Sequence, residues 1–258
     1  MVARALVVAV PTTKVSGLPP LPGTTQDAIG MADLLKGRGF SDVRLQEHGL
    51  TVDEFVNELL RLRADTQAGD LALVHFSGHG YRVADLDGDE TDDHLDESLV
   101  LSGDKLLVDD WFRKTFWPGT AEGSWWVTCA DTCFSGSVFR SVRYVREEDI
   151  PDEDTTPLPP IPSGPARIWL AAVGDGEKAL EIDRENRQYG WYTQQLREVL
   201  AEEPGITYSQ LWTRLQKRWK AARASWLSTV AHPQMAMTDA ALLLAGRPAF
   251  ASLDFEGS

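Results

Sequence analysis

The sequence has few cysteines, no long apolar run and no excess of basic residues. Its two cysteines, Cys129 and Cys133, are too few for a disulfide framework, and four residues apart they do not form a four-ligand zinc site. The longest early apolar run, residues 5–10, is far shorter than a membrane span or a signal peptide. We therefore expect a soluble, cytoplasmic protein of a reducing compartment, without a membrane partner.

Basic side chains are outnumbered, 25 against 39 acidic ones, which gives a formal charge of −14. This balance argues against a nucleic-acid partner, because phosphate binding needs clustered lysine and arginine. Residues 85–97 hold eight carboxylates and residues 147–154 hold six, with no Lys or Arg in either segment. The rest of the chain is balanced, so the composition describes a neutral globule with two acidic segments.

Apolar strand patterns alternate with helix patterns along the chain, which predicts an α/β sheet, mostly parallel, with helices on both faces. The predicted strands are residues 5–10, 43–45, 71–76, 125–130 and 168–173, and the predicted helices are residues 26–36, 51–64, 190–201 and 207–224. Thr51 and Glu54 form a capping-box pattern at the start of the second helix. We interpret the aromatic stripe of the last helix as a core-facing surface.

Residues 141–165 break this pattern. Six of the 14 prolines and the whole second acidic run lie there, and no hydrophobic periodicity remains. This composition is typical of an extended linker. It divides the chain into a larger part, about residues 1–140, and a smaller part, residues 166–258.

A histidine and a cysteine each follow a predicted central strand. His79 lies between Gly78 and Gly80, and Cys133 lies in a polar turn. Nucleophilic catalysis needs a nucleophile, a nearby base and donors for the oxyanion, and the carboxyl ends of parallel strands meet at one crevice. The separation of 54 residues is close to the roughly 50 of caspase-type proteases. Cys129 falls inside an apolar strand and is predicted to be buried.

The segments His75-Phe-Ser-Gly-His79-Gly80 and Asp131-Thr-Cys133-Phe-Ser-Gly136 resemble the paired signatures of metacaspases and bacterial caspase homologues. The resemblance implies one caspase-like (caspase-hemoglobinase) peptidase domain with a mostly parallel sheet of about six strands. It also implies large-subunit-like and small-subunit-like parts on either side of the linker. Similar segments continue in order along the chain at residues 23–35, 95–98, 108–110, 190–193, 207–211 and 232–234.

The resemblance assigns roles to the two catalytic candidates. It implies that Cys133 is the nucleophile and His79 the base of a cysteine endopeptidase that needs no cofactor for its chemistry. The backbone N–H groups of Gly80 and Cys133 are the expected oxyanion donors. No third group that would orient His79 is evident in the sequence, so a dyad is predicted.

The resemblance also implies a pocket for the residue before the scissile bond (S1), formed by Asp27, Ser77 and Asp131. Paired carboxylates suit a guanidinium or an ammonium and repel an acidic side chain, so we expect protein or peptide substrates cleaved after Arg or Lys. Phe134 stands where metacaspases usually carry histidine. We expect this change to alter the pocket rim and to leave the dyad functional.

Calcium is a candidate activator, because Asp96, Asp109 and Asp110 match family positions linked to calcium. The spacing of an EF-hand is absent, and Phe139 and Arg140 stand where a further family acid is found. A solvated acidic loop at residues 85–97 is the alternative interpretation.

Arg143 and Arg146 precede the second acidic run and are candidate sites at which a zymogen processes itself. An upstream activator protein is the other expected trigger, and the family suggests bacterial defence or cell death. Two other readings are a catalytically silent caspase-fold binding module and a flavodoxin-like domain. Intact His79 and Cys133 argue against the first, and no Gly-rich phosphate loop supports the second.

Overall fold

The computed structural model describes most of the chain outside the predicted linker. The candidate processing sites Arg143 and Arg146, the second acidic run and Phe134 lie outside the described residues. The described residues are 2–85, 88, 94–133, 166–173, 178–184, 187–225, 232–237, 241 and 246–251.

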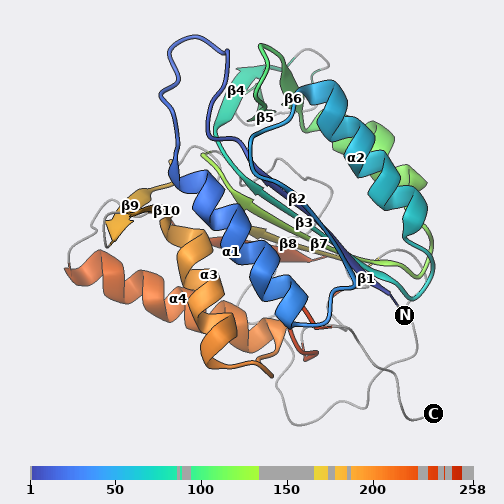
Figure 1. The fold of residues 1–258 in the computed structure, drawn as a ribbon, viewed down its shortest axis with the longest axis vertical. Coiled ribbons are helices and arrows are strands. Elements are labelled where there is room, and N and C mark those ends of the chain that lie inside the picture. The colour runs from blue at the N-terminus through green and yellow to red at the C-terminus, as the bar shows by residue number, and fades with distance from the viewer. Residues whose placement is uncertain are drawn as a thin grey trace.

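A six-stranded sheet forms the centre of the molecule (Figure 1). Its strands are β1 (Ala3–Ala9), β2 (Asp42–Gln46), β3 (Leu71–Ser77), β7 (Trp125–Asp131), β8 (Ala166–Ala171) and β11 (Gln234–Met237). The order is β11-β8-β7-β3-β1-β2, with β11 antiparallel to β8 and the other neighbours parallel. Because β8 pairs with β7, the two parts separated by the predicted linker share one sheet.

Helices cover both faces of this sheet (Figure 1). The α-helices are α1 (Gly23–Gly37), α2 (Val52–Asp65), α3 (Trp191–Glu202) and α4 (Tyr208–Ser225), and two short helices are η1 (Phe112–Phe116) and η2 (Trp117–Gly119). Successive side chains of β1 point to opposite faces of the sheet. Ala5 and Val7 pack in the core with α1, α3 and α4, and Leu6 and Val8 pack in the core with α2 and η1. A strand buried on both faces reads as a continuous apolar run, which is why the sequence revealed it.

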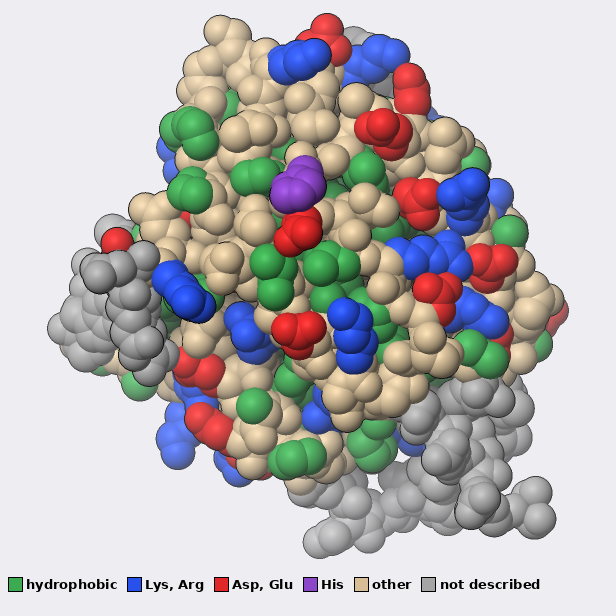
Figure 2. Space-filling view, viewed as in Figure 1, with side chains coloured by type: hydrophobic (Ala, Val, Ile, Leu, Met, Phe, Trp, Pro, Cys, Tyr) green, Lys and Arg blue, Asp and Glu red, His purple; other side chains and the backbone are tan. Residues whose placement is uncertain are grey.

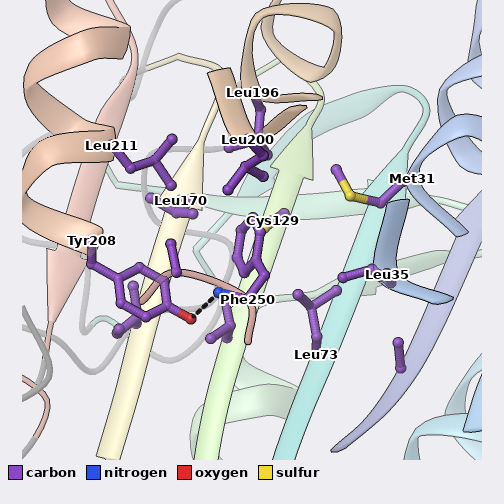
Figure 3. Packing of buried hydrophobic residues seen from close by; sticks show 14 of the residues in the cluster. Met31, Leu35, Leu73, Cys129, Leu170, Leu196, Leu200, Tyr208, Leu211 and Phe250 are labelled. Atoms are coloured by element: carbon purple, nitrogen blue, oxygen red, sulfur yellow. Dashed lines mark hydrogen bonds between the residues drawn. The ribbon is translucent and has the colours of Figure 1, made fainter. Parts of the chain in front are cut away.

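The core under α1, α3 and α4 is shown in Figure 3. Leu196 of α3 lies near Leu170 of β8 and Cys129 of β7, Met31 of α1 lies closer to β3, and all four side chains are at most 1% exposed. Near the other end of this layer the backbone N–H of Phe250 donates to the hydroxyl of Tyr208 over 3.2 Å. The interpretation of the aromatic stripe of α4 as core is therefore confirmed for its first two turns.

The predicted fold class is confirmed, with a mostly parallel six-stranded sheet between helices. The capping box of α2 is also present. The backbone N–H of Glu54 donates to Thr51 Oγ1 over 3.4 Å, and the N–H of Thr51 donates to Glu54 Oε2 over 2.8 Å.

Two small antiparallel sheets were not predicted. One contains β4 (Gly80–Ala84), β5 (Leu95–Val100) and β6 (Leu106–Val108), and the other is the hairpin of β9 (Glu181–Arg184) and β10 (Arg187–Gly190). The reading of residues 85–97 as a solvated loop is wrong at its last three residues, which belong to β5. Glu97 is only 3% exposed, because it forms an ion pair with Arg82 of β4 at 3.3 Å. Such a pair lets a charged side chain be buried in a strand.

Charges of both signs are interspersed over the face of the molecule seen in Figure 2. Ion pairs of this kind include Arg218 of α4, which contacts Glu198 and Glu202 of α3 at 2.8 and 2.6 Å. Among the described residues, no helix is long and apolar enough to cross a membrane.

Candidate active site

The sequence-predicted residues meet at a cavity of about 190 Å³ at the carboxyl ends of β3 and β7. His79, Cys133, Asp27, Ser77 and Asp131 all line it. The two strands are parallel neighbours in which Ser77 pairs with Asp131, so the turns that follow them emerge side by side. Sheet register thus brings together residues that are distant in sequence.

The ring of His79 is oriented by a backbone carbonyl. Its Nε2 lies 2.7 Å from the carbonyl oxygen of Pro19. A carbonyl only accepts, so this hydrogen bond places the proton on Nε2 and leaves Nδ1 with the lone pair in the neutral ring. Pro19 is a third group that the predicted dyad lacked. The Pro-rich loop that carries it was visible in the sequence, but every residue has a carbonyl and no motif marks this one.

The thiol of Cys133 is partly covered and faces several charged or polar groups. Burial raises its pKa, the facing N–H of Ala179 lowers it, and the negative charge of Asp131 raises it. The net direction is upward, so the thiol is mostly protonated at neutral pH. Chemistry at this sulfur therefore needs a base to take its proton.

The second cysteine has a different environment. Cys129 is 1% exposed inside β7, and burial raises the pKa of its thiol strongly. A thiol that does not ionise and that solvent does not reach is inert. The structure therefore separates a structural cysteine from a candidate nucleophile four residues further along the same chain segment.

Gly80 allows β4 to pass directly beside the turn of Cys133. A Cβ at position 80 would overlap the carbonyl oxygen of Cys133 and the hydroxyl of Thr132. Any larger residue would displace this turn and with it the thiol. The glycine of the His-Gly pair is thus required sterically, in addition to its predicted role as an oxyanion donor.

Asp27 and Asp131 form the acidic end of the cavity. Asp27 Oδ2 accepts hydrogen bonds from Ser77 Oγ at 3.0 Å and from the N–H of Gly190 at 2.9 Å. Asp131 Oδ2 accepts from the N–H of Thr193 at 2.9 Å. Burial, followed by the charge of Asp131, holds the pKa of Asp27 well above its usual range, and burial likewise raises the pKa of Asp131. Two buried like charges of this kind are stabilised by an incoming cation.

Gly190 separates these two carboxylates. A Cβ there would overlap Asp131 Oδ2 and would lie 2.9 Å from Asp27 Oδ2. The residue is the last of β10 and precedes α3, so the small-subunit-like part supplies a wall of the pocket. Residues 190–193 resemble the family in sequence, but the sequence did not indicate that they border the pocket.

A buried layer lies behind the pocket. His75 Nε2 is 3.3 Å from Thr193 Oγ1, and burial, assisted by the charge of Arg197, lowers the pKa of His75 to about 3. His75 is therefore neutral at physiological pH and does not compete with His79 as a base. Thr193 links this histidine to Asp131 through its own N–H.

The candidate calcium ligands Asp96, Asp109 and Asp110 lie on β5 and at the start of the segment leading into η1. The carboxylate of Asp110 pairs with Arg113 and with Lys114, the latter at 2.8 Å. Across the described part of the chain, no three His, Cys, Asp or Glu side chains gather as a metal ion requires. The calcium site therefore stays a prediction, in which a metal would have to compete with existing ion pairs.

The parallel sheet places a cysteine and a histidine at the ends of adjacent strands, beside an acidic pocket, which is the arrangement expected of the caspase class. The chain belongs to the caspase domain family, whose sequence pattern it matches over residues 3–242.

Relatives by sequence and by structure agree with this assignment. Metacaspase-7 of Arabidopsis thaliana is 32% identical over 111 residues, which are 43% of this chain and 26% of that protein. Protein GSU0716 of Geobacter sulfurreducens has the same fold, with a TM-score of 0.70 and 20% identity over 98% of this chain and 100% of that one. Caspase-1 of Spodoptera frugiperda superposes with a TM-score of 0.56 and 15% identity over 91% of this chain and 86% of that one. The matched segments span less than half the length of the curated metacaspases.

Proposed function

We propose that this protein is a cysteine endopeptidase that cleaves protein or peptide substrates after arginine or lysine. One observation supports it above all: a single cavity is lined by a thiol, an imidazole and two buried carboxylates, from Cys133, His79, Asp27 and Asp131. The first two residues suit acyl transfer, and the last two suit a basic side chain at the adjacent position.

The chemistry follows from the proton positions. His79 Nδ1 takes the proton of the Cys133 thiol, and the thiolate attacks the scissile carbonyl carbon. The resulting oxyanion accepts hydrogen bonds from the backbone N–H groups of Gly80 and Cys133. Nδ1–H then protonates the leaving amine, and the C–N bond breaks to leave a thioester. His79 finally deprotonates a water molecule that hydrolyses the thioester and restores the thiol. The Pro19 carbonyl stabilises the imidazolium by accepting from Nε2–H.

A peptide panel tests the proposal. Fluorogenic peptides that differ only in carrying Arg, Lys or Asp before the scissile bond are compared at neutral pH, with reductant present. We expect cleavage after Arg and Lys and none after Asp, because the carboxylates of Asp27 and Asp131 repel an acidic substrate side chain. Cleavage after Asp alone would contradict the pocket assignment. An inactive wild type would favour the silent caspase-fold module.

Calcium activation is a separate part of the proposal. Calcium is titrated into chelator-treated enzyme, and cleavage rate and melting temperature are both followed. If Asp96, Asp109 and Asp110 bind the ion, both quantities rise with calcium, and Asp109→Asn shifts the midpoint upward. Magnesium serves as the control, because it prefers a rigid six-coordinate shell. Unchanged rate and melting temperature would remove calcium from the mechanism.

A further inference from the structure

Glu181 is a third carboxylate in the wall of the active-site cavity, and the sequence did not single it out. It is the first residue of β9 and lies in the wall beside Ala179 and Leu180. Asp27 belongs to α1 and Asp131 to β7. Carboxylates from three separate elements therefore converge on one cavity.

The first turn of α1 holds the Glu181 side chain in place. A Cβ at Gly23 would lie 2.7 Å from Glu181 Oε1, so the glycine provides the space that the carboxylate occupies. The backbone N–H of Gly23 faces the same carboxylate, and N–H groups at a helix N-terminus attract negative charge. Pro22, the N-cap residue, supplies no side-chain cap bond. Capping of α1 is thus one explanation for Glu181, and an experiment must separate it from a role in recognition.

Among the residues that the structure describes, two buried carboxylate oxygens in this cavity have no hydrogen-bond partner: Asp27 Oδ1 and Glu181 Oε1. Asp27 is 0% exposed, and its other oxygen is occupied by Ser77 and Gly190. Buried acceptors without donors cost free energy. The cavity is therefore complementary to a ligand that brings donors to two walls at once.

We propose that Glu181 is the specificity-determining residue that makes this cavity select arginine over lysine before the scissile bond; this rests on the proposed cleavage after basic residues. A guanidinium carries five N–H donors in a flat fork and can donate to Asp27 and Glu181 together. An ammonium concentrates its donors on one nitrogen and is more strongly hydrated, so burial costs it more. Without the charge of Glu181, the two aspartates accept either cation.

The positive charge of Arg197 makes the negative charge of Glu181 important for binding a substrate cation. Its guanidinium packs against Gly30 of α1, and its positive charge acts on Asp27 from behind the pocket. That charge offsets part of the attraction that Asp27 exerts on a substrate cation. Glu181 contributes the negative charge that restores it.

The test variant is Glu181→Gln, because glutamine keeps the length of the side chain and an oxygen that accepts from Gly23 while removing the charge. Asp183→Asn is the matched control, since it removes a charge from an exposed side chain of the same strand. With peptides that differ only in Arg or Lys, we expect Glu181→Gln to lower kcat/KM about 10- to 100-fold for Arg and less than about 5-fold for Lys. Asp183→Asn leaves both values unchanged. Equal losses for both peptides, or no loss, would overturn the assignment and leave Glu181 as a helix cap.

Binding provides a readout that does not depend on hydrolysis. Calorimetry with n-butylguanidine and n-pentylamine should show tighter binding of the guanidine to the wild type and loss of this preference in Glu181→Gln. If the wild type hydrolyses nothing but shows the preference, the proposed protease function fails and the role of Glu181 stands. If basic peptides are cleaved but the variant keeps the wild-type ratio of the two affinities, the role of Glu181 fails and the function stands. Binding of neither cation also overturns the assignment.

Discussion

Replacing Cys133 with alanine will reduce cleavage of an arginyl peptide to the uncatalysed level, a loss of kcat/KM of about 10⁴-fold or more. The described residues of the cavity hold no other thiol, and the imidazole of His79 has no nucleophile to activate without it. The rate is measured with the fluorogenic arginyl peptide. Alkylation by iodoacetamide, followed by intact-mass measurement, reports whether the reactive thiol is gone.

Cys129→Ala is the matched control for this experiment. It removes the other thiol from the same strand region, where Cys129 is buried in the core away from the cavity. We expect near wild-type activity and a stability loss of about 1 kcal/mol from the lost sulfur packing. Loss of activity in Cys129→Ala together with a fully active Cys133→Ala would show that the nucleophile is misassigned.

The Cys133→Ala variant also reports on self-processing, which we propose occurs after Arg143 or Arg146. N-terminal sequencing of stored wild type and variant compares the two chains directly. New termini after either arginine in the wild type alone support processing in this segment. An intact wild type after long incubation counts against it.

Asp27→Asn will lower kcat/KM for arginyl peptides by about 10²- to 10³-fold while raising the melting temperature. The asparagine oxygen can accept from Ser77 and Gly190 as Asp27 Oδ2 does, but the amide then presents N–H donors and no charge to the substrate cation. Asp33→Asn, an exposed position on the same helix, is the control and should change neither quantity.

The gain in stability follows from the sign of the pKa shift. Burial and the charge of Asp131 raise the pKa of Asp27 above its value in the unfolded chain. A carboxyl with a raised folded pKa destabilises the folded state at any pH above its unfolded pKa, and this penalty disappears when the charge is removed. A gain of about 1 kcal/mol would raise the melting temperature by roughly 2–4 °C. A fall in melting temperature would mean that Asp27 is a structural ion-pair partner instead of a strained binding group.

The central strands and the two catalytic candidates were accessible to sequence reasoning for a common physical reason. Strands buried on both faces, such as β3 and β7, must be apolar throughout, and the polar residues that follow them mark the strand ends. His79 and Cys133 stand out because each follows the end of such a run and lies near a glycine. At these two positions, the residues that mark the strand ends are also the catalytic candidates.

Strands that contain charged residues could not be predicted in this way, because they lack a continuous apolar run. β5 begins with Leu95-Asp96-Glu97, and its burial depends on Arg82 of β4, a partner that pairing across the sheet supplies. β9 contains only four residues, and its first, Glu181, lies next to Gly23 solely because the hairpin folds onto α1. No periodicity in the sequence encodes such contacts.

The α/β class and the strand ends that carry His79 and Cys133 could be predicted from the sequence pattern, because apolar continuity and its interruption are properties of a single chain segment. The aspartates Asp27 and Asp131 were predicted only through the resemblance to a family. Only the tertiary structure decided which groups complete the site. The Pro19 carbonyl that orients His79, the glycine that separates the two aspartates and the third carboxylate of Glu181 come from segments far apart in the chain. Their roles arise from distance and direction, which exist only after the sheet, α1 and the β9–β10 hairpin have packed together.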